Sequence, residues 1–260
     1  LAGIGGGVLF VPLASSFFPF HIDFVRGTGL FIALGSSLAA APHLLGKNLA
    51  SIKLALPTAL VASAFAVVGA FFGLWLSALN PAYIQGSLGV TIIGIVFIML
   101  FAKDSEHPSV AGGNYLTQML HIGGIYQEET TGKEVSWTVH NTGKGLFCFV
   151  FVGLLAGIFG LGAGWANMPI LNMIMGAPVK VAVATSGLAL SVTDSTAAWI
   201  YLNKGAVLPM ITVPSLVGIM LGARIGSKLL PKVKPAAVRY IVISVLFLAG
   251  VRSLMKAFGY

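Results

Sequence analysis

Charged residues and cysteine are scarce in this chain of 260 residues. Asp, Glu, Lys and Arg together make up 8% of the sequence, and only seven residues are acidic. A soluble domain averages about 25% charged residues, so this composition argues against a soluble globular protein. Cys148 is the one cysteine, which excludes a disulfide or a cysteine metal site within these residues. The cysteine content therefore does not indicate whether the chain lies in an oxidising or a reducing compartment.

Motifs of common enzymes are also missing. The sequence has no His-x-x-Glu-His zinc motif, no Gly-x-Ser-x-Gly nucleophile turn and no phosphate-binding loop with a lysine. Asp194 is the one acidic residue that falls inside a long hydrophobic segment. We therefore predict a protein that is not an enzyme, has no catalytic residues, cofactor or metal, and is not driven by ATP hydrolysis in this chain.

Hydrophobic residues, by contrast, make up 57% of the chain. A helix of roughly 20 apolar residues crosses the hydrocarbon core of a bilayer, which is about 30 Å thick. The sequence therefore predicts an all-α polytopic protein of the cell membrane with about eight hydrophobic segments. Basic residues at the segment ends, next to lipid headgroups, account for the net charge of +8, so nucleic acid is not an expected partner. The long windows are 24–45, 54–79, 83–102, 145–159, 181–202, 206–221 and 240–255.

The chain contains an internal repeat. Residues 3–73 align without a gap on residues 160–230, at a distance of 157 positions. We therefore expect two homologous four-segment repeats, and we expect the first half-helix of the first repeat to precede this numbering. The repeats are predicted at 1–102 and 145–260. Equivalent pairs include Gly3 and Gly160, Gly5 and Gly162, Gly7 and Gly164, Pro12 and Pro169, Thr28 and Thr185, and Lys47 and Lys204.

A polar stretch at 103–144 joins the repeats and is predicted to lie outside the membrane. Val135, Trp137 and Val139 alternate with polar residues, which is typical of a half-buried strand. The segment 121–127 is expected to pair with it as a β-hairpin. The stretch serves as a spacer or lid between the repeats, or as a separate binding domain.

Glycine clusters occur at equivalent places in the two repeats. The first reads GIGGGVLFVP at 3–12, and the second reads GLGAGWANMP at 160–169. Residues 145–176 are too many for one straight crossing, and glycine lowers helix stability by about 1 kcal/mol per residue. We therefore predict discontinuous helices broken at the glycines. Unwound backbone in a bilayer must be buried in protein or line a cavity.

A second half-helix should follow each break. Pro12 and Pro169 are expected to open these half-helices, because the first-turn amides have no helical partner. Two half-helix N-termini facing a common centre would present amides and partial positive charge to an anion. Close helix packing is the alternative reading of the glycines, and it is the one favoured for Gly218, Gly222 and Gly226.

The positions of Lys and Arg favour an inverted repeat. If every segment crossed the membrane, the flanking basic residues would be divided about equally between the two faces, whereas cytoplasmic loops normally carry an excess. If each glycine-broken segment enters and returns on one side, ten basic residues share one face against three. This arrangement is typical of secondary transporters. The ten are Lys47, Lys53, Lys103, Lys133, Lys144, Lys180, Lys228, Lys232, Lys234 and Arg239, and the three are Arg26, Lys204 and Lys256.

Three stretches of the second repeat resemble one family of membrane proteins. They read GLGAGWANMPILNMIMGAPVKVAVATSG, YLNKGAV and GARIGSKLLP. The chain resembles the TauE/SafE family, known for exporting sulfite and organosulfonates and grouped by two copies of a four-segment unit. The resemblance implies a secondary transporter that exports small sulfur-containing anions. An anion channel, an uptake carrier for other small anions such as thiosulfate or carboxylates, or a non-transporting receptor are the alternatives, and the oligomeric state stays open.

Candidate site residues follow from the breaks and from polar groups in hydrophobic segments. Asp194 and Arg224 are candidates for gating or coupling, or for a structural ion pair that fixes two helices. Hydroxyl groups after the half-helices can donate to sulfonate oxygens or can instead cap the next helix. The predicted substrate-binding residues are Gly5, Gly7, Thr28, Gly162, Gly164, Asn167, Thr185 and Ser186.

Overall fold

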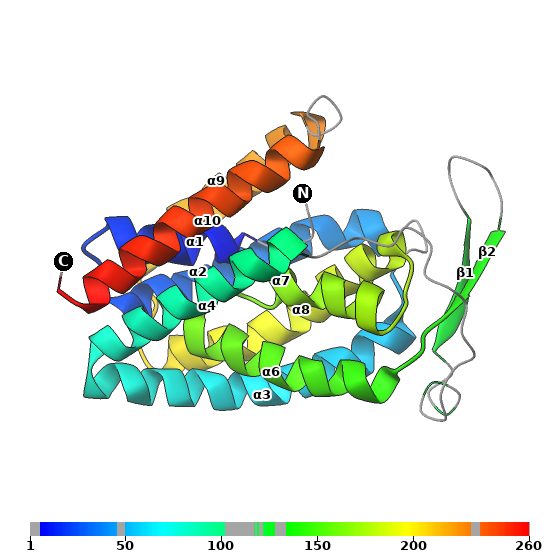
Figure 1. Ribbon diagram of the computed structural model, residues 1–260, viewed down its shortest axis with the longest axis horizontal. Coiled ribbons are helices and arrows are strands. Elements are labelled where there is room, and N and C mark those ends of the chain that lie inside the picture. Colours follow the sequence, from blue (N-terminus) through cyan, green and yellow to red (C-terminus); the bar gives the residue numbers. More distant parts are fainter. Residues whose placement is uncertain are drawn as a thin grey trace.

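The protein folds into a bundle of long helices with a small hairpin at one end (Figure 1). The structure, a computed structural model, describes the backbone of residues 6–45, 50–101, 117, 119, 122–127, 134–229 and 235–259. It describes the side chains of these residues except 40–45, 101, 126, 127, 134, 135, 223–229 and 235–239. The elements are α1 (Gly7–Phe17), α2 (Ile22–Leu45), α3 (Ile52–Leu79), α4 (Pro81–Phe101), β1 (Gly123–Gln127), β2 (Glu134–Thr138), α6 (Thr142–Phe159), α7 (Gly164–Pro169), the π-helix η1 (Ile170–Ile174), α8 (Val179–Asn203), α9 (Pro209–Leu229) and α10 (Pro235–Ala257).

The outer surface of the bundle is apolar, as expected of a protein in lipid. Within the described part of the chain, five helices are long and apolar enough to cross a membrane: α2, α3, α4, α6 and α10. Large side chains point outward, and Trp75 and Trp199 are 56% and 62% exposed. So much exposed apolar area would be unusual on a soluble monomer. The chain is therefore a mostly helical, multi-pass membrane protein.

The two strands pair as an antiparallel hairpin, with Gly123 opposite Thr138 and Gln127 opposite Glu134. Trp137 is 6% exposed and Val139 is fully buried, and both belong to the main hydrophobic core. The base of the hairpin is therefore packed against the helices. We call this end of the bundle the hairpin end.

Helix α3 connects the hairpin end to the opposite end. Helix α6 packs along α3 in the same direction, because Gly153 lies against Ala62 and Gly157 lies against Ala66. At 1.5 Å per residue, the 28 residues of α3 span about 42 Å. At the opposite end, α4 follows directly after Asn80. The length of α3 therefore separates the two ends of the bundle.

Two short helices end at different ends of the bundle. The amide of His140, just before α6, donates to the carbonyl of Met175, just after η1, at 2.8 Å. Met175 therefore lies at the hairpin end. Lys256 Nζ, near the end of α10, donates to the carbonyl of Ser15 in the last turn of α1, at 2.7 Å. Gln85, in the second turn of α4, also donates to that carbonyl, so α1 ends at the opposite end.

The helix starts keep the spacing found in the sequence. Helices α1 and α7 begin at Gly7 and Gly164, and α2 and α8 begin at Ile22 and Val179. Helices α3 and α9 begin at Ile52 and Pro209. Each pair is 157 positions apart.

The prediction that proline opens the half-helices is wrong. Pro12 and Pro169 are each the sixth residue of their helix, and the helices begin at Gly7 and Gly164. Proline in a helix interior removes one backbone hydrogen bond. In the second repeat the chain continues from Pro169 as the π-helix η1, which widens the helix at this point.

Gly218 and Gly222 of α9 do not make the predicted packing contacts with any described residue. No described atom lies within 4 Å of a Cβ atom built on Gly218 or on Gly222. Gly226 lies outside the described side chains. The close helix contacts occur instead between α3 and α6, where a Cβ on Gly157 would lie 2.1 Å from the Ala66 carbonyl oxygen.

Candidate functional site

The chain leaves the helical conformation between α6 and α7. Helix α6 ends at Phe159, and α7 begins at Gly164. Gly160 and Gly162 have φ angles of +67° and +73°, a left-handed conformation that favours glycine. We call residues 160–163 the break. All four of its residues are buried, so its backbone is enclosed by protein.

The break is held against α1 and α2 by close backbone contacts. A Cβ atom on Gly160 would lie 2.3 Å from the carbonyl oxygen of Arg26 in α2. A Cβ on Gly29 would lie 2.6 Å from the Gly160 oxygen, and a Cβ on Gly7 would lie 2.7 Å from the Leu161 oxygen. The first residue of α1 therefore lies beside the break. Gly5, its predicted partner in the site, lies outside the described residues.

Asp194 of α8 lies at the break. A Cβ atom on Gly162 would lie 3.1 Å from Oδ2 of Asp194, and the backbone amide of Ala163 faces the carboxylate. The side chain is fully buried, and neither oxygen accepts a hydrogen bond of regular geometry from a described residue. The predicted pairing with Arg224 concerns a side chain outside the described set. The carboxylate is thus a polar group beside unwound backbone.

Two further polar side chains follow the break on α7. Trp165 is 9% exposed and Asn167 is fully buried. Among the described residues, Trp165 Nε1 and both polar atoms of the Asn167 amide have no hydrogen-bond partner. An indole N–H and an amide NH₂ are donors that suit an anion with several oxygens. The first repeat has Val8 and Phe10 at the equivalent positions, so it lacks both groups.

The predicted hydroxyl donors already have protein partners. Thr28 Oγ1 lies 2.9 Å from Thr212 Oγ1, so it joins α2 to α9. Thr185 Oγ1 accepts from the amide of Ser51, just before α3, at 3.1 Å and keeps its own hydrogen for donation. Ser186 donates to the carbonyl of Val183 within α8 at 2.9 Å. Thr28 and Thr185 therefore link α2 to α9 and α8 to the residue before α3.

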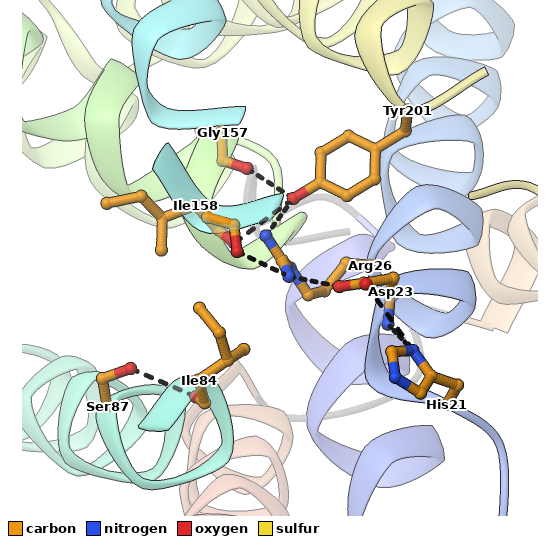
Figure 2. A network of polar contacts seen from close by, with 9 residues as sticks. His21, Asp23, Arg26, Ile84, Ser87, Gly157, Ile158 and Tyr201 are labelled. Atoms are coloured by element: carbon orange, nitrogen blue, oxygen red, sulfur yellow. Dashed lines mark hydrogen bonds and ion pairs between the residues drawn. The ribbon is translucent and has the colours of Figure 1, made fainter. Parts of the chain in front are cut away.

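A buried charged network, which the sequence did not predict, lies next to the break. Figure 2 shows the guanidinium of Arg26 between Asp23 and the hydroxyl of Tyr201. Arg26 is fully buried, and its Nη1 donates to Asp23 Oδ1 at 2.6 Å and to the carbonyl of Gly73 in α3 at 3.4 Å. Tyr201 donates to the Gly157 carbonyl in the last turn of α6 at 2.9 Å. The network ties α2, α3, α6 and α8 together where α6 ends.

The spacing of Asp23 and Arg26 is the signal that could have revealed this network. An acid and an arginine three residues apart meet on one face of a helix. Sequence analysis assigns Arg26 to the membrane surface because it stands near the start of a hydrophobic segment. Its complete burial corrects that assignment.

An apolar multi-pass bundle that encloses unwound backbone and unpaired polar side chains has the features of a membrane transport protein. The sequence model of the family described as "Sulfite exporter TauE/SafE" matches residues 1–253, so the chain belongs to this family of membrane transporters.

Curated relatives carry names of the same kind. The chain is 27% identical to the "probable membrane transporter protein MJ0441" of Methanocaldococcus jannaschii, over 98% of this chain and 90% of that protein. It is 24% identical to the "probable membrane transporter protein YunE" of Bacillus subtilis, over 96% of this chain and 90% of that protein. It is also 24% identical to the "probable membrane transporter protein YdhB" of the same organism, over 89% and 85%. No solved structure matches the chain.

Proposed function

We propose that this protein is a secondary transporter that exports small sulfur-containing anions such as sulfite or organosulfonates. The observation that carries the proposal is the buried break at 160–163, followed on α7 by the unpartnered donors of Trp165 and Asn167. Sulfite and sulfonate groups have three oxygens and can accept several hydrogen bonds at once. Neutral donors bind such a group without the cost of burying a lysine.

We propose further that the two repeats are inverted and that the anion binds between them. The constant spacing of the helix starts supports the repeat, and the ends of α1 and η1 at opposite ends of the bundle support the inversion. Gly7 lies beside the break, which brings the start of α1 to the proposed site. Gly5, Gly162, Gly164 and Thr185 complete the proposed site. Rocking of one repeat against the other would open it alternately to each side.

Two alternatives are an anion channel or uptake carrier for other small anions, and a membrane receptor that transports nothing. Purified protein in liposomes, tested with sulfite, thiosulfate, taurine, sulfoacetate and acetate, separates these readings. A carrier exchanges labelled internal anion for unlabelled external anion, and the direction of net flux under an imposed gradient distinguishes export from uptake. In a carrier, external anion accelerates the efflux of labelled internal anion, whereas a channel gives conductance and an efflux that external anion does not accelerate. Absence of flux for the whole panel would contradict the transport proposal.

Replacing Asn167 by Ala should weaken anion binding without unfolding the protein. The change removes one hydrogen bond to a charged group, worth about 1 to 3 kcal/mol, which corresponds to an increase of roughly 5- to 150-fold in the half-saturating anion concentration. The measurement is the concentration dependence of exchange in liposomes. Asn203→Ala, at the exposed end of α8, is the matched control and should behave as the parent protein. Equal affinity of the Asn167→Ala and parent proteins would show that the anion binds elsewhere.

A further inference from the structure

Asp194 is a buried carboxylate within the bundle, and it needs a positive partner. Neither of its oxygens has a regular hydrogen bond among the described residues, and the side chain is fully buried. A charged carboxylate in this position costs several kcal/mol unless a cation or a proton compensates it. The partner must therefore be a basic side chain, a metal ion or a proton.

Basic side chains on the surrounding helices do not fill this role among the described residues. Helix α8 packs against α2, α3, α6, α7 and η1. Arg26, the one fully buried cation among the side chains that the structure describes, has Asp23 as its partner at 2.6 Å. The short helices α7 and η1 carry no titratable residue. Apart from Asp194 itself, α8 and its neighbours carry the following described titratable side chains: Asp23 and Arg26 on α2, Lys53 on α3, Lys144 and Cys148 on α6, and Lys180 and Tyr201 on α8.

A metal ion fits this place poorly. Hard cations prefer about six oxygen ligands, whereas Asp194 offers a single carboxylate. The described residues contain no group of three or more His, Cys, Asp or Glu that could hold a metal. The carbonyls of Gly160 and Leu161 are in close contact with Gly29 and Gly7. A proton needs only one carboxylate oxygen, so it suits the site better.

We propose that Asp194 binds a proton that crosses the membrane together with the anion. This inference rests on the proposed function, because the anion site lies at the break beside Asp194. A negative anion and a charged carboxylate repel each other at short distance, so binding of the anion favours the protonated carboxyl. The proton adds to the carboxylate as the anion binds, and it leaves to water after the anion is released. A doubly charged anion then crosses with a net charge of −1, which an inside-negative membrane potential drives outward.

The test uses the purified full chain in liposomes that contain a pH-sensitive dye, with the membrane potential clamped by potassium and valinomycin. Sulfoacetate is the probe, since both of its acidic groups are ionised near neutral pH and its own titration does not contribute. Inward sulfoacetate flux through the parent protein should acidify the lumen. Asp194→Asn should keep sulfoacetate exchange, and its rate of lumen acidification should be at least tenfold lower than that of the parent protein. Ser195→Ala, an exposed neighbour on α8, is the control and should match the parent.

The outcomes separate this inference from the proposed function. Sulfoacetate flux without acidification in the parent protein, or full acidification in Asp194→Asn, overturns proton coupling and leaves the transport function standing. No flux of sulfoacetate or of any other panel anion overturns both. Arg224→Gln tests the ion-pair alternative: the same loss of acidification in that variant would assign Asp194 to a pair and overturn the inference. Asp194→Ser, which copies the equivalent Ser37, replaces Asp194→Asn if the latter does not fold.

Discussion

At the scale of single residues, the protein buries two kinds of charge in different ways. Arg26 is surrounded by partners: the Asp23 carboxylate, the Gly73 carbonyl and the Tyr201 hydroxyl. Its guanidinium also lies over the Tyr201 ring, 5.1 Å from the ring centre. Asp194 has no such shell among the described residues. Both Nη atoms of Arg26 therefore have protein partners, although its buried Nε has none, whereas neither carboxylate oxygen of Asp194 has a regular one among these residues.

Replacing Tyr201 by Phe should destabilise the bundle. The hydroxyl joins Arg26 to the Gly157 carbonyl, and its loss leaves buried polar groups without a partner, which costs about 1 to 3 kcal/mol. Thermal unfolding in detergent measures the change. The control is Trp199→Phe, on the lipid-facing side of the same helix. An unchanged unfolding temperature in Tyr201→Phe would mean that the network contributes nothing to stability.

Asp23 and Arg26 should show coupled effects on stability. Asp23→Asn leaves the fully buried Arg26 charge unpaired and should lower the free energy of unfolding by about 3 to 5 kcal/mol, whereas Arg26→Gln leaves the partly exposed Asp23 carboxylate and should cost less. The double variant removes both charges and should recover part of the loss, as a double-mutant cycle in detergent would show. Strictly additive losses would contradict a direct interaction.

At the scale of elements, glycine serves two purposes that spacing alone does not distinguish. Gly157 lets α6 approach α3, whereas Gly218 on α9 faces no described atom. Both occur in small-residue patterns, but only the partner helix decides whether such a pattern is used. Contact between helices far apart in sequence is a tertiary property, and for this reason the packing prediction for Gly218 and Gly222 fails among the described residues, while that for Gly226 stays a prediction. Hydrophobic length and the alternation around Trp137, by contrast, are local signals, and the helices and β2 lie where they indicate.

An alanine at Gly157 and one at Gly218 should therefore have opposite effects. Gly157→Ala forces its methyl group to within 2.1 Å of the Ala66 carbonyl oxygen and should destabilise the protein by about 1 to 3 kcal/mol. Gly218→Ala meets open space and should be neutral or stabilising by up to about 1 kcal/mol, because alanine favours the helix. Unfolding temperatures of the two variants make the comparison. Equal shifts would contradict the α3–α6 contact.

At the scale of the whole molecule, the sequence predicted the membrane-protein class and the family, because these depend on composition and on short motifs, whereas the two inverted repeats stay a prediction. It did not predict that Arg26 is buried or that the prolines lie at the sixth helical position. Burial of Arg26 depends on Tyr201, which is 175 positions away. Asp194 was singled out from its segment alone, but its position beside Gly162 emerged only from the fold.

Lys47 and Lys204 give a test of the proposed inversion. Equivalent residues of inverted repeats lie at opposite membrane faces, so cysteines introduced at the two positions should react with an impermeant thiol reagent from opposite sides of sealed vesicles. Cys148→Ser provides the cysteine-free background. Labelling of both positions from the same side would indicate repeats related by an axis along the membrane normal.

The hydrogen bond between His140 and Met175 has a consequence for how the chain folds during synthesis. It joins residues 35 positions apart, so the loop that it closes is short and its entropic cost is small. The α6–η1 unit can therefore form soon after residue 175 enters the membrane. The contact between Gln85 and Ser253 joins α4 to α10 across 168 positions and must wait for the last helix. Until then the face of α4 that carries Gln85, Gly89 and Ile92 lacks its partner, and premature termination of the chain before α10 would leave that face open to degradation or aggregation.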